Sequence, residues 1–180
     1  PDPNTASYTL SLHDALPILL RGACGSSATS IVLCLEDAIA ASDVPAGLET
    51  LDRILADLPA QLPVRAFLRP RHYEMARDIC EKARGTAIDG IVAPKILPET
   101  LPSWMAMARD ADLTVMPTLE SSVFFDPGKI CAIRDILDDW RDDPNRIAAI
   151  RLGGNDLLAS MGLRRERGLT SWDGPLGWVL

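Results

Sequence analysis

The chain has 180 residues, of which 47% are hydrophobic and 24% are charged, and its formal net charge is -7. This composition is typical of a globular protein with one sizeable core. The negative charge disfavours partners that bind through phosphate neutralisation or through an anionic membrane surface, so we expect no nucleic acid and no membrane among its partners.

The first 29 residues are rich in turn formers and show no sustained periodicity. The stretch SYTLSLHDALPI, residues 7–18, resembles translated sequencing-adapter sequence. We therefore expect residues 1–29 to be non-native or disordered, although LPILL, residues 16–20, could pair as an edge strand. The apolar run at 15–20 is too short to span a bilayer and lacks the features of a signal peptide, so we expect a cytoplasmic protein.

From residue 30 onward, short apolar runs alternate with longer amphipathic runs. The predicted strands are 30–37, 63–68, 89–95, 113–120 and 146–154, and the predicted helices are 43–58, 72–84, 101–110, 128–140 and 155–162. In the first helix, Ser42 or Asp43 is placed to cap the amino end.

Strands that are apolar on both faces and separated by helices predict a parallel sheet covered by helices. The strands start near residues 31, 63, 89, 113 and 146, a spacing close to the roughly 31 residues per unit of a (β/α)8 barrel. We expect an α/β fold, a partial TIM barrel with about five or six parallel strands over residues 30–180. An open doubly wound sheet has similar units and remains the alternative.

Charged residues follow the strands at the points where they stop. They are Glu36 and Asp37, Arg69 and Arg71, Lys95, Glu120, and Asn155 with Asp156. The carboxyl ends of parallel strands share one rim, which is where α/β enzymes keep their sites. For one such residue taken singly, such as Asp37 or Lys95, a polar strand exit is a more ordinary interpretation than a site role. Asp156 alone could be a simple helix N-cap.

The acids Glu120 and Asp156 end successive strands and would repel each other unless a cation or a proton lay between them. With only two histidines and four scattered cysteines (Cys24, Cys34, Cys80, Cys131), a metal should be a hard cation held by oxygen, Mg2+ or Mn2+. Gly153 and Gly154 would let a small ligand approach the backbone, and Arg69 or Arg71 could grip a carboxylate. Such a site suits carbon-carbon bond cleavage or formation in a 2-oxo acid through a metal-stabilised enolate.

At these residues the sequence resembles the HpcH/HpaI aldolase and citrate lyase beta-subunit family, Mg2+-dependent carbon-carbon lyases on a TIM barrel. The resemblance rests on four motifs in order: IVLCLEDAIA, IDGIVAPKI, VMPTLES and RLGGNDLLASMGL. The ending GLRRERGLTSWDGPLGWVL is similar to the subgroup found in bacterial tellurium-resistance clusters.

The resemblance implies metal ligation by Glu120 and Asp156 and binding of the substrate carboxylate by Arg69. Arg71 is the second choice, because FLRPRHYE departs from the Arg-x-Asn usual in the family. Glu36 and Asp37 would hold the waters of the metal, while Lys95, Gly153 and Gly154 would line the substrate site. A 2-oxo acid or an acyl-CoA is the implied substrate class, but Cys34 stands where citrate lyase relatives often carry an acid, which argues against citryl-CoA.

The chain is short for a closed barrel, so we expect it to be incomplete and its full-length parent to be a homo-oligomer. One alternative is a catalytically silent interaction or regulatory protein of a stress-response cluster, in which RRER at 164–167 docks an acidic partner or phosphates beside Trp172 and Trp178. A receiver-type domain is the other, although its lysine should follow the last strand and Lys95 follows the third visible one.

Overall fold

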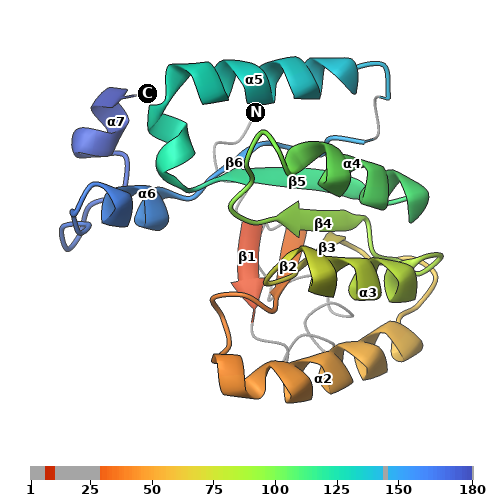
Figure 1. Ribbon diagram of the computed structural model, residues 1–180. Coiled ribbons are helices and arrows are strands. Elements are labelled where there is room, and N and C mark those ends of the chain that lie inside the picture. Colours follow the sequence, from red (N-terminus) through yellow and green to blue (C-terminus); the bar gives the residue numbers. More distant parts are fainter. Residues whose placement is uncertain (1–6, 11–28, 144–145, 180) are drawn as a thin grey trace.

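The computed structural model describes residues 7–10, 29–143 and 146–179. Within them lies a sheet of six parallel strands, arranged in space in the order in which they occur in the chain (Figure 1). They are β1 (Ser7–Leu10), β2 (Ser30–Cys34), β3 (Arg65–Arg69), β4 (Gly90–Ala93), β5 (Thr114–Leu119) and β6 (Arg151–Leu152). Each predicted strand of 30–154 is therefore confirmed in type and approximate place.

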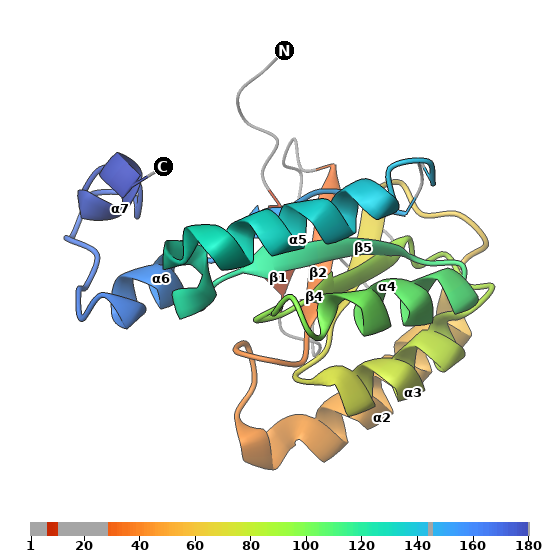
Figure 2. The ribbon, with the colours of Figure 1, turned by 45° about the horizontal axis from the view of Figure 1, so that its top comes forward.

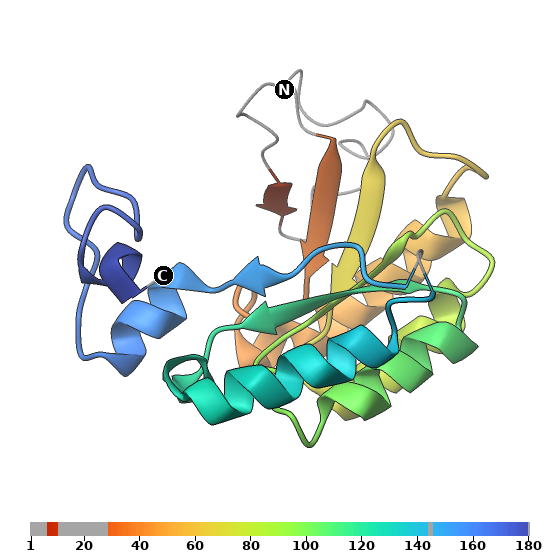
Figure 3. The same cartoon turned by 90° about the horizontal axis from the view of Figure 1, so that it is seen from above.

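The helices are α2 (Val44–Asp57), α3 (Tyr73–Ala83), α4 (Leu101–Asp110), α5 (Pro127–Asp139), α6 (Gly154–Ser160) and α7 (Pro175–Val179), with short 3-10 helices η2 (Ala41–Asp43) and η3 (Ser122–Phe125). Helices α2 to α5 form a row along one side of the curled sheet, and each contacts the next (Figure 2). Helices α6 and α7 lie apart from this row, beyond the ends to which β5 and β6 point (Figure 3).

The strand order decides between the two predicted architectures. A doubly wound sheet, including the receiver type, grows in both directions from a central strand and therefore reverses its strand order. Here every strand pairs only with its predecessor and its successor along the chain, as in a barrel. The partial TIM barrel is confirmed, and the doubly wound and receiver-type alternatives are wrong.

The sheet has an outer and an inner face, and both are apolar along the middle of the strands. The outer face packs against the helices in the main core, which includes Leu33, Leu68 and Ile91. The inner face carries a separate cluster of four buried side chains: Val32, Phe67, Val92 and Met116. Because side chains alternate along a strand, residues two or four positions beyond these four also point inward.

Two helix starts show how local sequence sets the element bounds. Asp126 precedes α5, and its carboxylate accepts hydrogen bonds from the backbone N-H groups of Gly128 at 2.9 Å and Lys129 at 3.2 Å. Asp43 occupies the corresponding position before α2, but its side chain makes no capping bond and accepts a hydrogen bond from Ser42 instead. The expected side-chain cap of α2 is therefore absent.

Strands β1 and β6 differ from the expected elements. Strand β1 falls in the segment 1–29, where no native element was expected, while LPILL lies outside the described residues. Strand β6 has only two residues. The segment 146–150 before it pairs with β5 at one isolated bridge, between Val115 and Ile147, through the backbone hydrogen bonds that Val115 makes with Arg146 and Ala148. No helix of the described residues is long and apolar enough to cross a membrane.

Candidate active site at the carboxyl ends of the strands

Side chains alternate between the two faces of the sheet, and three charged side chains that point to the inner face meet where β2, β3 and β5 end. Glu36, Arg69 and Glu120 follow the inner residues Val32, Phe67 and Met116 by four, two and four positions, and all three are buried. The Nη2 of Arg69 lies 3.1 Å from both carboxylate oxygens of Glu120 and also pairs with the carboxylate of Glu36. One guanidinium group therefore forms ion pairs with two buried acids.

Lys95 joins this cluster from the end of β4. Its Nζ donates to Oε1 of Glu36 at 2.9 Å, and its backbone N-H donates to Oε1 of Glu120 at 3.0 Å. The backbone adopts a φ of 47°, in the left-handed region that non-glycine residues rarely occupy. This conformation lets one residue contact both acids, and the hydrogen bond that the Lys95 ammonium group donates to Glu36 raises its pKa.

Two further acids stand nearer to solvent. Asp37 has a side chain that is 60% exposed, and its Oδ2 lies 3.5 Å from Nη2 of Arg69. Asp156, in the first turn of α6, is half-buried. Helix α6 follows Gly153, and Asp156 makes no capping bond, so the N-cap interpretation of Asp156 is wrong.

The electrostatics of the cluster follow from its burial. Burial raises the pKa of the Glu120 carboxyl, Arg69 and the Lys95 N-H oppose the change, and the negative charges of Glu36 and Asp156 add to it. Burial alone would lower the pKa of Arg69, but the charges of Glu120, Glu36 and Asp37 leave it raised.

The structure separates the roles of the two candidate arginines. Arg71 directs its Nη2 away from the acids and donates to the backbone carbonyl oxygens of Glu36 and Ile39, each at 2.8 Å. It therefore holds the loop that follows β2. Arg69 is the arginine in contact with the acid cluster.

The two glycines of RLGGND are required by close packing. A Cβ built on Gly153 would lie 2.3 Å from the Cβ of Glu120, and one on Gly154 would lie 2.7 Å from the Cβ of Ser171. Neither distance is compatible with a side chain. Gly153 makes room for the Glu120 side chain, while Gly154 makes room for the segment before α7.

The sequence reasoning missed Arg151 and Thr118. They are register partners in β6 and β5, and Thr118 lies between Met116 and Glu120 on the inner face, so Arg151 points inward as well. Burial lowers the pKa of Arg151, and the positive charge of Arg69 lowers it further. The signal in the sequence was an arginine two positions before Gly153, inside a predicted strand whose only other charged residue is Arg146 at its start.

The donor set of this site fits a hard divalent cation. Mg2+ usually takes one or two carboxylates from a protein and leaves its other positions to water and substrate. Glu120 and Asp156 supply two oxygen donors whose mutual repulsion a cation would relieve. Among the described residues no group of three or more histidine, cysteine, aspartate or glutamate side chains gathers to hold a metal.

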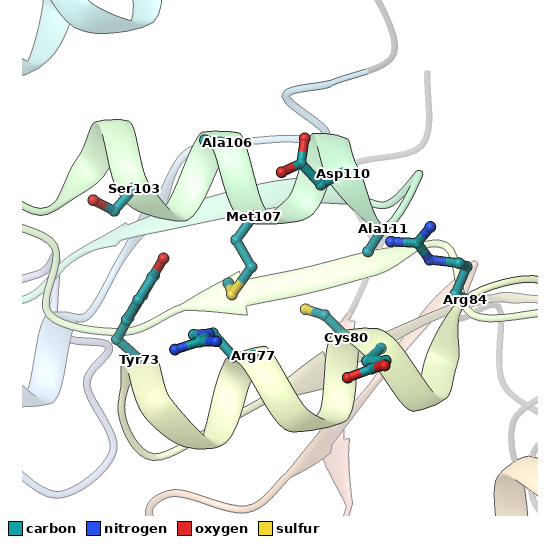
Figure 4. Close-up of a pocket in the computed structure, with 10 residues that line it drawn as sticks. Tyr73, Arg77, Cys80, Arg84, Ser103, Ala106, Met107, Asp110 and Ala111 are labelled. Atoms are coloured by element: carbon teal, nitrogen blue, oxygen red, sulfur yellow. The ribbon is translucent and has the colours of Figure 1, made fainter.

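A hollow lies elsewhere, between α3 and α4. It has a volume of about 770 Å³, and Figure 4 shows Tyr73, Arg77 and Cys80 of α3 facing Ser103, Met107 and Asp110 of α4. None of the predicted site residues lines it. It belongs to the outer helical layer, whereas sites of parallel α/β folds form at the carboxyl ends of the strands.

Parallel strands in sequential order, an outer row of helices and a charged cluster at the strand ends define an α/β-barrel scaffold of the TIM type. The chain belongs to the family of C-C bond lyases of the TIM-barrel fold, whose family model matches residues 12–180. No curated protein matches the chain.

Solved structures share the fold. The chain is similar to a malate synthase of Haloferax volcanii in a lead(II) complex, with 19% identity, a TM-score of 0.61, and coverage of 91% of this chain and 54% of that one. It is similar to the citrate lyase beta subunit of M. tuberculosis complexed with oxaloacetate and magnesium, with 22% identity, a TM-score of 0.55, and coverage of 89% and 63%. It is also similar to RipC from Yersinia pestis, with 18% identity, a TM-score of 0.60, and coverage of 98% of this chain and 67% of that one. The chain thus spans about half to two thirds of the length of these proteins.

Proposed function

We propose that the protein of which this chain is part cleaves or forms a carbon-carbon bond in a 2-oxo acid or acyl-CoA type substrate, with Mg2+ or Mn2+ as cofactor. The observation that carries the proposal is the contact of Arg69 with both Glu36 and Glu120 at the strand ends. Similar structures support the substrate class, since the citrate lyase beta subunit is complexed with oxaloacetate and magnesium and the malate synthase with magnesium and glyoxylate.

In this proposal Glu120 and Asp156 hold the cation, which would supply Lewis-acid polarisation of the substrate carbonyl. The substrate carboxylate binds to Arg69. Negative charge that develops on the substrate during bond cleavage faces the guanidinium of Arg69 and the ammonium group of Lys95, both of which the structure holds in place.

The remaining residues position these groups. Glu36 accepts from Lys95 and pairs with Arg69, so it fixes the orientation of both cations. Asp37 is the acid with most access to solvent and is the candidate to hold water or to exchange a proton at the mouth. A cytoplasmic location and a homo-oligomeric parent stay predictions.

The test is exchange of the methyl protons of pyruvate in D2O, followed by NMR in the presence of Mg2+ or Mn2+. The full-length parent should catalyse exchange, EDTA should abolish it, and Glu120→Gln and Asp156→Asn should each reduce it by about 100-fold or more, the effect expected when metal ligation is disturbed. Asp139→Asn is the matched control, because it removes an equal charge from an exposed position on α5. A folded wild-type protein that catalyses no exchange with either metal contradicts the proposal.

A second candidate is a binding protein without lyase chemistry, favoured by the surface before α7. Residues 161–170 are all exposed and include Arg164, Arg165 and Arg167, while Trp178 is 83% exposed. If Glu120→Ala leaves the cellular phenotype of the parent gene intact and Arg164→Glu abolishes it, this candidate replaces the lyase. The opposite pattern supports the lyase.

A further inference from the structure

The inner face of the sheet holds a second arginine, Arg151, one step deeper in the barrel than the acid cluster. Arg151 lies two positions before Gly153, and its register partner Thr118 lies two positions before Glu120. Since residues two apart share a strand face, Arg151 and Thr118 lie directly below the contact between Gly153 and Glu120.

Five buried side-chain atoms of the described residues have no hydrogen-bond partner. Oε2 of Glu36 forms an ion pair with Arg69, and Nε of Arg71 lies beyond the end of β3. The other three, Nε of Arg69, Oγ1 of Thr118 and Nη1 of Arg151, belong to residues of the inner face. The residues Arg69 and Thr118 are themselves more than nine-tenths buried. A buried donor without a partner is costly, and folded proteins rarely tolerate several at one place unless a ligand or ordered water satisfies them.

The same three atoms are complementary to an anion. Arg69 has committed Nη2 to Glu120, Glu36 and Asp37, which leaves its Nε edge for another acceptor. Arg151 brings a second positive charge close to the first. Two neighbouring guanidinium groups repel each other, and a carboxylate between them would remove that repulsion while accepting several charge-assisted hydrogen bonds.

We propose that Arg151 and Thr118 complete, together with the Nε edge of Arg69, a binding site for the carboxylate of the substrate on the inner face of the sheet. This inference rests on the proposed function for the identity of the ligand and adds two residues to its site. Neither Arg151 nor Thr118 is placed among the metal ligands, so their contribution to anion binding can be measured without a metal.

The test is binding of oxalate, a small planar stand-in for a 2-oxo acid, to the protein in EDTA, measured by calorimetry. Wild-type protein should bind oxalate, and Arg151→Gln should weaken binding about 10-fold or more, as expected for the loss of a charge-assisted hydrogen bond. Thr118→Val should weaken it several-fold. Arg141→Gln is the matched control, since Arg141 pairs with Asp138 on an exposed surface and should leave binding unchanged.

A second measurement uses the wild-type chain and does not depend on the folding of any variant. Phenylglyoxal modifies accessible arginines, and the modified positions are mapped by mass spectrometry. Oxalate should protect Arg151 from modification at least several-fold while leaving Arg141 unprotected. Absence of oxalate binding in EDTA, or equal modification of Arg151 with and without oxalate, overturns the proposal.

These results are separable from the fate of the proposed function. If oxalate binds through Arg151 but the protein catalyses no proton exchange, the carboxylate-site proposal stands and the proposed lyase function is wrong. Metal-dependent exchange in a protein whose oxalate affinity is unaffected by Arg151→Gln would retain the lyase and reject this role of Arg151.

Discussion

Gly153 lies against the side chain of Glu120, so closely that a Cβ at position 153 would fall 2.3 Å from the Cβ and 2.6 Å from Oε2 of Glu120. The contact joins the turn after β6 to the buried acid after β5. It explains why the RLGGND motif carries its first glycine: the side chain of the neighbouring strand occupies the space that any other residue would need. The position of Glu120 therefore depends on a residue of a different strand.

Replacing Gly153 by alanine should displace Glu120 from Arg69. We expect the free energy of unfolding to fall by about 1–3 kcal/mol, the usual cost of overpacking a filled site, and the oxalate and metal affinities to fall with it. Urea denaturation and calorimetry measure these effects. Gly174→Ala is the control, because a Cβ at Gly174 meets no atom within 4 Å; equal losses in the two variants would contradict the close-contact explanation.

Replacing Arg69 by methionine should leave two buried carboxylates without their shared cation. Breaking a buried ion pair in this way typically costs about 3–5 kcal/mol of unfolding free energy. Arg69 opposes the rise that burial causes in the pKa of the Glu120 carboxyl. Without the cation this folded-state pKa should rise further, so the deficit of the variant should be smaller at pH 5 than at pH 7.5. Urea denaturation at the two pH values measures the difference.

The comparison for Arg69 is Lys95→Met, which removes a cation whose side chain is 53% exposed. Its cost should be about 1 kcal/mol or less, because exposed pairs are screened by solvent. A loss for Lys95→Met as large as that for Arg69→Met would show that exposure does not govern these contacts.

Replacing Arg71 by methionine should loosen the loop after β2 without removing the carboxylate site. Its Nη2 donates to two backbone carbonyl oxygens, at Glu36 and Ile39, and loss of a hydrogen bond from a charged donor costs about 1.5–3 kcal/mol. Hydrogen exchange should become faster in residues 36–40, whereas oxalate affinity should change far less than in Arg69→Met. A large loss of affinity with unchanged exchange would assign Arg71 to the substrate instead.

The buried Cys80 thiol should make stability fall in alkaline solution. Burial raises the pKa of Cys80 from 9.0 to about 12, so between these values the folded state keeps a proton that the unfolded state has released. The unfolding free energy should then decrease by up to about 1.4 kcal/mol per pH unit above pH 9.

The measurement for Cys80 is urea denaturation of wild type and Cys80→Ala from pH 8 to 10.5. The variant should lose the part of the alkaline slope that this thiol contributes. Cys131→Ala replaces an exposed thiol and should retain the wild-type slope. Identical slopes in wild type and Cys80→Ala would contradict the assignment.

The sequence by itself determined the order and type of the elements from residue 30 onward. Buried parallel strands are apolar on both faces, and the helices that cover them repeat every 3.6 residues, so each element carries a local signal. The points at which the predicted strands stop also placed Glu36, Arg69 and Glu120 at one rim, because the carboxyl ends of parallel strands lie on the same side of a sheet.

The tertiary structure decided what local patterns do not contain. The choice between a barrel and a doubly wound sheet depends on which strands pair, and both arrangements use the same βα units. The roles of Arg69 and Arg71 could be told apart only in the folded structure, where Arg71 donates to backbone carbonyl oxygens of the loop after β2. Arg151 lies on the inner face of the sheet because it is the register partner of Thr118. Strand pairing and contacts between distant residues are properties of the folded chain, and no single segment encodes them.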